Sequence, residues 1–298
     1  MARRIGGRVR VKDILVFLLL AVLTVTFLYP VFFMLVNSLK ARAEYFTNPF
    51  SMPAALQLEN YSTMISQFQI LKLFRNSFLV SAGSVVLLLV VCTFASYVFA
   101  KYRFKGRTIV YLAILVTMFI PSQVTIIPLY VLFSRVGLVN RYWSVILSYL
   151  ALFLPEAILL MTANFRSIID ELLEAAEIDG CGYFQKVWNV VVPMGRAAIF
   201  LAIIFYFIMA WNDLFTPMIF LQNMEKRTVM VALAALMGRY TGAPTLQLAG
   251  LLLSAVPALI VYIIFQKNII RGLSSGSIEE GGLPHAVARE GSCSSIPP

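Results

Sequence analysis

A run of carboxylates is the most distinctive polar feature of the sequence. Residues 170–179 carry five acids and no base, in a chain whose 24 lysines and arginines outnumber its 14 acids. The acids are Asp170, Glu171, Glu174, Glu177 and Asp179. Ala175 and Ala176 give the same segment a small surface. Such a helix can enter a basic cleft on another protein, but an ordinary solvated surface helix has the same composition, so the residues alone leave both interpretations open.

Glycine and proline set the boundaries of this segment. Good helix formers continue as far as Glu177, and Gly180 then stops the helix or turns it sharply. We expect a second short helix at about 183–190 and, from Pro193 onward, the approach to the next apolar run. The loop 164–197 is therefore expected to hold a helix, a tight turn and a second helix.

Two further acids lie in apolar surroundings. Glu156 follows Pro155, and Asp213 follows Trp211 and Asn212. A carboxylate near the bilayer centre costs about 2.5–3.5 kcal/mol on insertion scales, so both acids should face a helix bundle or water. They could line a translocation path or gate, or they could make interhelical hydrogen bonds. Trp211 could stack on a sugar ring, although packing in a core is its more ordinary role.

Enzymatic and metal chemistry lack the residues that they need. The single histidine is His285, and Cys92, Cys181 and Cys293 are too widely spaced for a zinc, haem or redox motif. The sequence contains no phosphate-binding loop of the G-x-x-x-x-G-K-[ST] type and no nucleophile elbow. We therefore expect no catalytic residue, no metal and no cofactor, and any ATP that drives this protein must be bound by another subunit.

The composition indicates a membrane protein. Hydrophobic residues make up 60% of the 298 residues, charged residues make up 13%, and the mean hydropathy is +0.85. A soluble domain is about half apolar and a quarter charged, so a water-soluble fold is excluded. The net charge of +10 is typical of cytoplasmic loops in a membrane protein rather than of nucleic-acid binding.

Six apolar runs are each long enough to cross a bilayer, which takes about 20 residues per helix. They cover roughly 14–36, 78–100, 109–133, 143–163, 198–221 and 249–270. A backbone in lipid must satisfy its own hydrogen bonds, and no period-2 alternation is visible, so we expect an all-α polytopic membrane protein with six helices. The first run is longer than the apolar region of a signal peptide and has no cleavage site, so we expect it to be retained.

The distribution of bases sets the expected topology. Five bases lie in 1–13, and the loop 101–107 carries four. The positive-inside rule places both segments in the cytoplasm, and six spans then place both termini there, together with the loop 164–197. The stretch 228–237 is too short to span and suits a re-entrant or interfacial helix. The Gly-, Ser- and Pro-rich tail 272–298 is expected to be disordered.

The acidic loop resembles a known motif. Glu174-Ala175-Ala176, Gly180 and Pro193 match the pattern EAA-x3-G-x9-I-x-L-P, with valine at the Ile and Leu positions. This pattern is similar to the EAA loop of ABC importer permeases. Further stretches resemble the carbohydrate, or maltose-type, branch of that family: Leu28-Tyr29-Pro30, Asn37-Ser38-Leu39-Lys40, Glu59-Asn60-Tyr61, Ile120-Pro121-Ser122-Gln123, Ile127-Pro128-Leu129-Tyr130 and Trp211-Asn212-Asp213.

The resemblance implies a transport subunit with the ABC importer permease fold, multi-pass in a bacterial inner membrane, for a sugar or sugar derivative. It implies three kinds of protein partner: a second homologous permease, a cytosolic ATPase dimer and an extracytoplasmic solute-binding protein, with no nucleic acid. The residues expected to couple to the ATPase are Glu174, Ala175, Ala176, Asp179, Gly180 and Pro193. The residues expected along the translocation path are Glu156, Trp211, Asn212 and Asp213. The alternative is a stand-alone, ion-coupled secondary transporter that uses Glu156 and Asp213.

Overall fold

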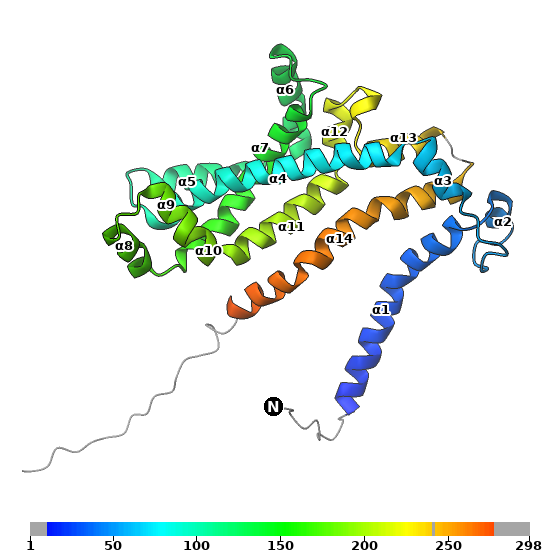
Figure 1. Ribbon diagram of the computed structural model, residues 1–298, viewed down its shortest axis with the longest axis horizontal. Helices are drawn as coiled ribbons and strands as arrows, with labels where there is room; N and C mark the ends of the chain where they lie inside the picture. Colours follow the sequence, from blue (N-terminus) through cyan, green and yellow to red (C-terminus); the bar gives the residue numbers. More distant parts are fainter. Residues whose placement is uncertain (1–10, 240–241, 277–298) are drawn as a thin grey trace, which may run out of the picture.

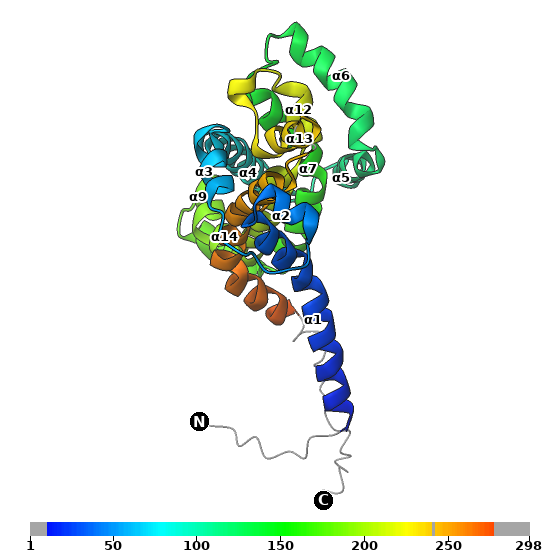
Figure 2. The ribbon, with the colours of Figure 1, turned by 90° about the vertical axis from the view of Figure 1, so that its right-hand side faces the viewer.

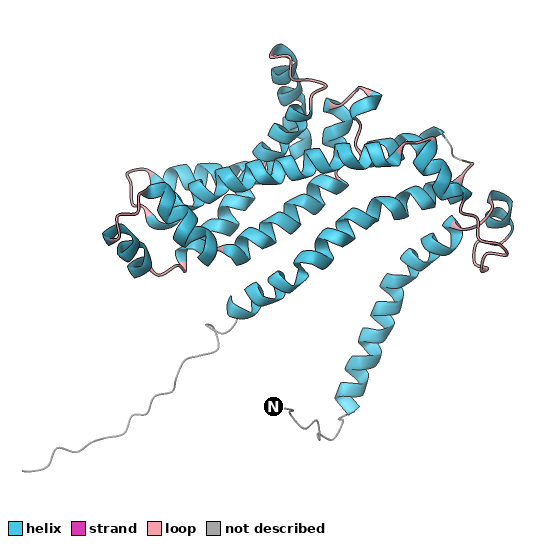
Figure 3. Cartoon of the chain, viewed as in Figure 1, coloured by secondary structure: helices cyan, strands magenta, loops and turns pink. Residues whose placement is uncertain are grey.

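The computed structural model describes residues 11–239 and 242–276, and within them every element is a helix (Figure 3). Four long helices form the body of the molecule (Figure 1): α4 (Ile70–Lys101), α7 (Tyr142–Arg166), α11 (Arg196–Asn212) and α14 (Pro244–Gly276). Helix α4 packs against α7 and α11, and α11 also packs against α14. This arrangement is the helical bundle that the apolar runs predict.

Small polar residues are part of the closely packed surfaces of α4 and α7. Six serines of these two helices are buried: Ser77, Ser81, Ser84, Ser96, Ser144 and Ser148. Ser84 and Ser148 donate to carbonyls one turn earlier in their own helices, and Ser96 donates across to the carbonyl of Ile158 at 3.4 Å. Small side chains let two helix backbones approach closely where lipid offers no hydrophobic driving force.

Helix α1 (Val11–Ser38) diverges from the bundle (Figures 1 and 2). None of the side chains in its most apolar 18-residue window is buried. Its C-terminal end is fixed by polar contacts: the Ser38 hydroxyl lies 2.6 Å from the Tyr61 hydroxyl, and Asn60 donates to the carbonyls of Ser38 and Lys40. Two of the stretches that resemble sugar permeases therefore meet here and hold one end of α1 to α3 (Glu59–Ser66).

The prediction of one continuous helix over 109–133 is wrong. The chain forms α5 (Arg107–Val116), a 3-10 turn η1 (Thr117–Phe119) and α6 (Ser122–Arg135), and the two parts are bent by 103°. The bend falls at Ile120, whose backbone is extended, directly before Pro121. Proline disfavours the helical conformation of the residue before it and donates no backbone hydrogen bond, which explains the position of the bend. Helix α6 projects from the bundle (Figures 1 and 2).

The expected helix 198–221 is also interrupted. Helix α11 ends at Asn212, Asp213 is extended, and a short α12 (Phe215–Phe220) follows. Among the described residues, four helices are long and apolar enough to cross a membrane, and the number rises to six if each of two bent pairs is one span. The second pair is 183–194 followed by α11, bent by 79°.

The short elements lie at the two ends of the bundle (Figure 1). At one end are α2 (Arg42–Thr47), α3, a 3-10 turn η3 (Met224–Lys226) and α13 (Val229–Arg239), which is the short helix expected at 228–237. The acidic loop lies at the other end. Helix α14 continues to Gly276, beyond the start of the expected tail at residue 272, and residues 1–10 and 277–298 lie outside the described part of the chain.

Candidate coupling surface and solute cavity

The acidic segment forms a short helix with a glycine-dependent end. Helix α8 (Asp170–Ile178) is followed by Gly180 at φ +81°, a left-handed conformation that glycine adopts without strain. The Cys181 amide donates to the Ala176 carbonyl at 2.9 Å, and the Gly180 amide donates to the Glu177 carbonyl at 3.0 Å. These two bonds are the Schellman arrangement, which satisfies carbonyls at a helix end. The predicted helix and tight turn at Gly180 are both present.

Five of the six residues predicted to couple to an ATPase lie on α8 and its C-terminal turn, and the sixth, Pro193, lies further along the loop in α10 (Val192–Met194). Glu174, Ala175, Asp179 and Gly180 are exposed, and Ala176 is half-buried. Ile178 is 88% exposed, whereas Leu173, on the inner side of α8, is buried. The free surface of α8 therefore combines carboxylates, alanines and two large apolar side chains, Leu172 and Ile178, which is a composition suited to a protein cleft.

Two of the five acids are paired within the chain. The Lys186 ammonium donates to Glu177 at 2.9 Å, and this hydrogen bond lowers the pKa of Glu177 and raises the pKa of Lys186. Asp170 accepts from Lys101 at 2.6 Å. The side-chain carboxylates of the other three acids make no hydrogen bond or ion pair within the part of the chain that the structure describes; these acids are Glu171, Glu174 and Asp179. These three carboxylates are available to a partner.

Helix α4 also contacts the loop 164–197, which we call the coupling loop. The Lys101 ammonium, at the end of α4, donates to the carbonyls of Arg166 and Ile168 as well as to Asp170. Its side chain is 9% exposed. It therefore joins three segments: the end of α4, the end of α7 and the first turn of α8. From the sequence, Lys101 was used only to predict the topology. Its position as the last residue of a long helix was the available signal for this second role.

An aromatic cluster strengthens the same joint. Tyr183, in α9 (Tyr183–Lys186), stacks on Phe94 of α4 at 6.1 Å between ring centroids, and its hydroxyl donates to the Phe94 carbonyl at 3.3 Å. Tyr97 and Tyr102 also contact the Tyr183 ring. Burial raises the pKa of Tyr183, so the hydroxyl stays protonated and able to donate. The segment that follows the turn at Gly180 is thus packed directly against α4.

The second half of the loop leads into α11 through a tight bend. A π-helical turn, η2 (Val187–Val191), is followed by α10 (Val192–Met194), in which Pro193 is exposed. Gly195 then lies against Phe165 of α7, whose ring is fully buried. A Cβ at residue 195 would overlap that ring and approach the Val191 carbonyl to 2.9 Å. Glycine is needed here because two helices make close contact, not because of its backbone angles.

A large cavity lies beside the bent α5–α6 segment. It has a volume of about 950 Å³, within the range of small-molecule sites. Three of the four predicted path residues line it: Glu156, Asn212 and Asp213. Two of the stretches that resemble sugar permeases, those that begin at Ile120 and Ile127, form the wall opposite these residues. They contribute Pro121, Ser122, Gln123 and Pro128. The polar lining is Thr117, Ser122, Gln123, Thr125, Tyr149, Glu156, Asn212, Asp213 and Thr216.

Asp213 has a structural role at the edge of this cavity. Its carboxylate accepts from the amides of Phe215 at 3.0 Å and Thr216 at 3.3 Å, which begin α12. The Tyr149 hydroxyl donates to the same carboxylate at 3.0 Å. Asp213 therefore caps one helix and attaches it to α7, a position typical of aspartate before a helix. The expectation that it lies inside a continuous helix was wrong, because the chain is extended at this residue.

The predicted path residues do not all face the cavity. Trp211 is 2% exposed, its indole NH donates to the Ser254 carbonyl of α14 at 2.9 Å, and its ring stacks on Phe207. It is a core residue between α11 and α14 and does not line the cavity. Glu156 is half-buried in the cavity wall, and no three His, Cys, Asp or Glu side chains come together as a metal site in the described ranges.

The sequence matches the model of a known protein family. The model of the family described as "Binding-protein-dependent transport system inner membrane component" matches residues 93–274, which is more than half of the chain. The chain belongs to this family. The matched range contains both the coupling loop and all four lining helices of the large cavity, and it confirms the resemblance to ABC importer permeases.

Individual relatives cover nearly the whole permease. A probable ABC transporter permease protein of Bacillus subtilis, YurM, is 31% identical over 264 residues, or 89% of this chain and 87% of the relative. A diacetylchitobiose uptake system permease of Streptomyces coelicolor, NgcG, is 29% identical over 265 residues, or 87% of this chain and 86% of the relative. A crystallised bacterial ABC transporter that imports alginate aligns with a TM-score of 0.75 at 23% identity, covering 88% of this chain and 99% of that one.

Family membership settles the general role of the permease. It is a multi-pass membrane subunit of a binding-protein-dependent transport system, and it is a transport component rather than an enzyme. Such a system implies an ATPase and a solute-binding protein as partners. The alternative of a stand-alone, ion-coupled transporter is not favoured.

Proposed function

We propose that this permease imports a sugar or a sugar derivative across a bacterial inner membrane. A second homologous permease pairs with it, a cytosolic ATPase dimer drives the pair, and a solute-binding protein delivers the solute from the other side. The observation that carries the proposal is the free acidic surface of α8, fixed to two membrane helices and exposed at one end of the bundle. The sugar class is supported by the relatives' named solutes.

The coupling residues act as one rigid unit in this proposal. Glu174 and Asp179 offer carboxylates to a cleft on the ATPase, Ala175 and Ala176 allow close approach, and Gly180 fixes the turn. When ATP closes the ATPase dimer, α8 moves, and its joints to α4 and α11 carry the displacement into the bundle. A ligand-driven change of this kind requires that the ATPase bind two packed states of the permease with different affinities.

The large cavity is the part of the solute path that this subunit supplies. The amide groups of Gln123 and Asn212 and the carboxyl group of Glu156 line it, and such groups can exchange hydrogen bonds with the hydroxyls of a sugar. The α8 end of the bundle faces the cytoplasm, together with both termini, and the end that carries α3 and α13 faces outward. The basic loop 101–107, which adjoins the α8 end, supports this orientation.

A crosslinking experiment tests the proposal. A cysteine replaces Ala175 in a chain in which Cys181 and Cys293 are changed to serine and only the buried Cys92 is kept. The membranes are treated with a short bifunctional thiol reagent. We expect a crosslinked product in which mass spectrometry finds a nucleotide-binding ATPase, and ATP-dependent uptake of one sugar from a panel by proteoliposomes of the purified assembly. A cysteine in place of Leu112, on α5, is the matched control.

Two results would overturn the proposal. A permease that takes up solute at full rate without any ATPase in the membrane would be a stand-alone transporter. Labelling of the Ala175→Cys variant by a membrane-impermeant thiol reagent from the outer side of intact cells would place α8 on the wrong face.

A further inference from the structure

A basic cavity lies at the corner where α4 ends and α5 begins. It has a volume of about 310 Å³, at the lower end of the roughly 300–1,000 Å³ of small-molecule sites. Lys101, which binds Asp170 of α8, comes directly before this corner in the chain, so the cavity lies at the α8 end of the bundle (Figure 1). We call the cavity the basic corner; its lining residues are Arg103, Phe104, Gly106, Arg107, Thr108 and Ile109.

The bases of the basic corner have no counter-ion in the described chain. Arg103, Lys105 and Arg107 form no ion pair and no side-chain hydrogen bond with any residue that the structure describes. The sequence contains no acid at residues 60–155, so neither α4 nor α5 supplies one. An arginine fork binds phosphate and carboxylate oxygens through paired, charge-assisted hydrogen bonds. Two unpaired arginines that line one cavity therefore favour an anionic ligand.

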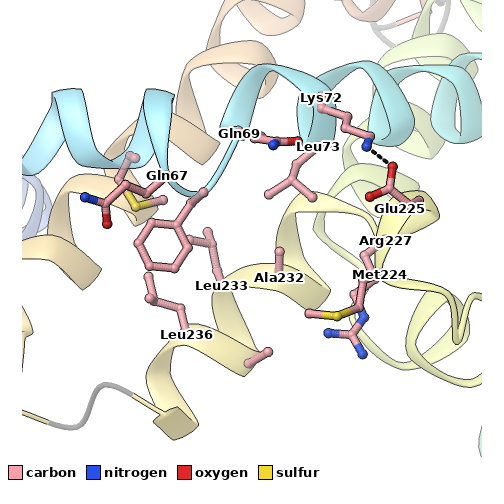
Figure 4. Close-up of a pocket in the computed structure, with 13 residues that line it drawn as sticks. Gln67, Gln69, Lys72, Leu73, Met224, Glu225, Arg227, Ala232, Leu233 and Leu236 are labelled. Carbon is pink, nitrogen blue, oxygen red and sulfur yellow. Dashed lines mark hydrogen bonds and ion pairs between the residues drawn. The ribbon is translucent and has the colours of Figure 1, made fainter.

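Bases at the opposite end of the bundle have a different environment. A cavity of about 270 Å³ there, between the start of α4 and the segment from η3 to α13, is also lined by bases, Lys72 and Arg227 (Figure 4). Glu225 lines the same cavity and forms an ion pair with Lys72. The chain thus neutralises part of the charge at that end, whereas the charge of the basic corner is left for a ligand from outside the chain.

Aromatic contacts hold the basic corner in shape. The Phe104 ring lies 6.2 Å from the Phe99 ring of α4, and the Phe99 ring lies 5.3 Å from the Tyr111 ring of α5, between centroids. The Arg166 guanidinium, at the end of α7, lies 5.8 Å from the centre of the Tyr111 ring. Gly106, at φ +84°, turns the chain into α5. A preformed cavity loses little entropy when a ligand enters it, which favours binding.

An exposed apolar stripe leads away from the basic corner along α5. Ile109, Leu112 and Val116 are exposed and share one face of the helix, because they are three and four residues apart. Helix α5 has ten residues, so it is about 15 Å long, half of the roughly 30 Å hydrocarbon core of a bilayer. Bases at one end of an apolar stripe that is one leaflet long match a phospholipid better than they match a soluble anion.

We propose that the basic corner binds the headgroup of an anionic phospholipid such as phosphatidylglycerol. Arg103 and Arg107 donate to the phosphodiester, and one acyl chain lies along the stripe of Ile109, Leu112 and Val116. The positive-inside rule accounts for the number of bases in this loop but not for a cavity that two of them line. Basic pockets at membrane helices bind such headgroups. The site goes beyond the proposed function, and it requires only that α5 lie in a bilayer.

Photolabelling in nanodiscs tests the proposal without any variant. The permease is purified with its partner subunits into phosphatidylcholine nanodiscs that contain a trace of phosphatidylglycerol with a diazirine in its acyl chain, or of phosphatidylcholine with the same label. Mass spectrometry then locates the labelled residues. We expect the phosphatidylglycerol probe to label residues 103–116 about tenfold more than the phosphatidylcholine probe. The preference should shrink as salt screens the bases. Equal labelling by the two probes would overturn the proposal.

Replacing the two arginines gives a second arm. The double variant Arg103→Gln, Arg107→Gln should lower labelling by the phosphatidylglycerol probe to the level of the other probe. The double variant Arg103→Lys, Arg107→Lys should retain most of the labelling, because it keeps the charge. Arg75→Gln with Arg141→Gln, at two exposed arginines near the other end of the bundle, is the matched control for net charge and should change nothing. Unchanged labelling in the glutamine variant of the basic corner would show that its arginines do not hold the lipid.

Two further outcomes would assign the basic corner to another ligand. Excess inorganic phosphate should reduce labelling no more than sodium chloride of equal ionic strength, and complete loss of labelling in phosphate alone would mean that the cavity takes a soluble anion. Loss of the co-purified ATPase from the glutamine variant, with labelling unchanged, would mean that the bases bind that protein. Either outcome would overturn the lipid site and leave the proposed transport function standing.

Discussion

The ammonium of Lys101 lies 2.6 Å from the carboxylate of Asp170 and joins the last residue of α4 to the first residue of α8. An exposed ion pair contributes little to stability, about 0–1 kcal/mol. The value of this pair is positional, because Lys101 also donates to two carbonyls at the end of α7. Lys101 is therefore one of the side-chain attachments that hold α8 to the bundle, with the buried Leu173 and the Glu177–Lys186 pair as others.

Lys101→Met should separate ATP hydrolysis from transport. The variant keeps the apolar part of the side chain but loses its donors, so α8 can move without moving α4. We expect solute uptake per ATP to fall roughly tenfold, since coupling energies between sites are typically 1–3 kcal/mol. Uptake and ATPase rates of the reconstituted assembly measure this ratio.

The conservative variant Lys101→Arg is the control for Lys101→Met, because it keeps the charge and several donors. We expect it to recover much of the coupling. An unchanged ratio of uptake to hydrolysis in the methionine variant would show that the joint is not used to transmit motion.

Gly180→Val should disturb the coupling turn through the backbone alone. A Cβ at this residue would meet no atom within 4 Å, so a clash is excluded as the cause. The left-handed conformation costs about 1–2 kcal/mol for an L-residue, and a β-branched one tolerates it least. We expect weaker assembly with the ATPase, measured by co-purification, and Gly180→Asn should retain most of it because asparagine visits this region readily. Full transport by the valine variant would count against the turn as a rigid coupling element.

The acidic helix and its stop at Gly180 could be predicted from the sequence because local chemistry determines them. The acids of α8 and the stop at Gly180 follow from residue types in an uninterrupted stretch, and the Schellman bonds need no distant contact. The short helix α13 and the apolar character of the long helices were predicted for the same reason. These features depend on neighbours within a few residues along the chain.

Features that depend on distant contacts were missed. Apolar runs look alike whether they are straight or bent, so the 103° bend before α6 was not predicted, although Pro121 offered a signal for it. Asp213 looked like an acid inside a span because its two amide donors and Tyr149 become visible only in the fold. Trp211 was placed on the path because hydrophobicity cannot distinguish a cavity wall from the contact with α14.

The Glu177–Lys186 pair should make the loop insensitive to pH near neutrality. The pKa of Glu177 is lowered below 4.5, so its contribution is complete above that value and is lost as the pH falls through the lowered pKa. The pKa of Lys186 is raised above 10.5, so its contribution is complete below that value and is lost as the pH rises through the raised pKa. Between pH 4.5 and pH 10.5, we therefore expect no change in the hydrogen-exchange protection of amides 177–186 that arises from titration of this pair.

Glu177→Gln should loosen the same segment at neutral pH, because the neutral amide can accept a hydrogen bond from the Lys186 ammonium but cannot form an ion pair with it. Faster hydrogen exchange in α9 is the expected result. Glu171→Gln is the matched control, since Glu171 has no partner among the described residues and its loss should change nothing in α9. Equal exchange in both variants would mean that the pair does not hold the loop.

Gly195→Ala should destabilise the junction between α10 and α11 by overlap with Phe165. Overpacking a filled core typically costs about 1–3 kcal/mol. A lower temperature of thermal unfolding in detergent is the expected result. Combining it with Phe165→Leu, which makes room for the methyl group, should recover part of the loss, and additive effects of the two changes would contradict the contact. Gly238→Ala, a site with open space around it, should leave stability unchanged or slightly raised.

Asp213→Asn separates the proposed mechanism from ion coupling. Asparagine caps helices about as well as aspartate. Its single oxygen can keep the position that accepts from the Tyr149 hydroxyl and the Thr216 amide, and only the bond from the Phe215 amide is lost, so most of the start of α12 should remain. Because ATP drives transport in the proposed mechanism, we expect uptake to stay within a few-fold of wild type. Asp213→Leu, which removes every acceptor and leaves the Tyr149 hydroxyl without this partner, should lower both the amount of folded protein and uptake.

The ion-coupled alternative makes the opposite prediction for Asp213→Asn. Loss of a titrating carboxylate would abolish uptake while the protein still folds, and a proton ionophore would abolish wild-type uptake as well. Glu156→Gln extends the test, since the Glu156 carboxylate is the second acid on the cavity wall and the amide retains its shape. Under the proposed mechanism, uptake persists in both amide variants and in the presence of ionophore, and it stops when ATP is withheld. That result would require the driving force to enter through α8 rather than through these carboxylates.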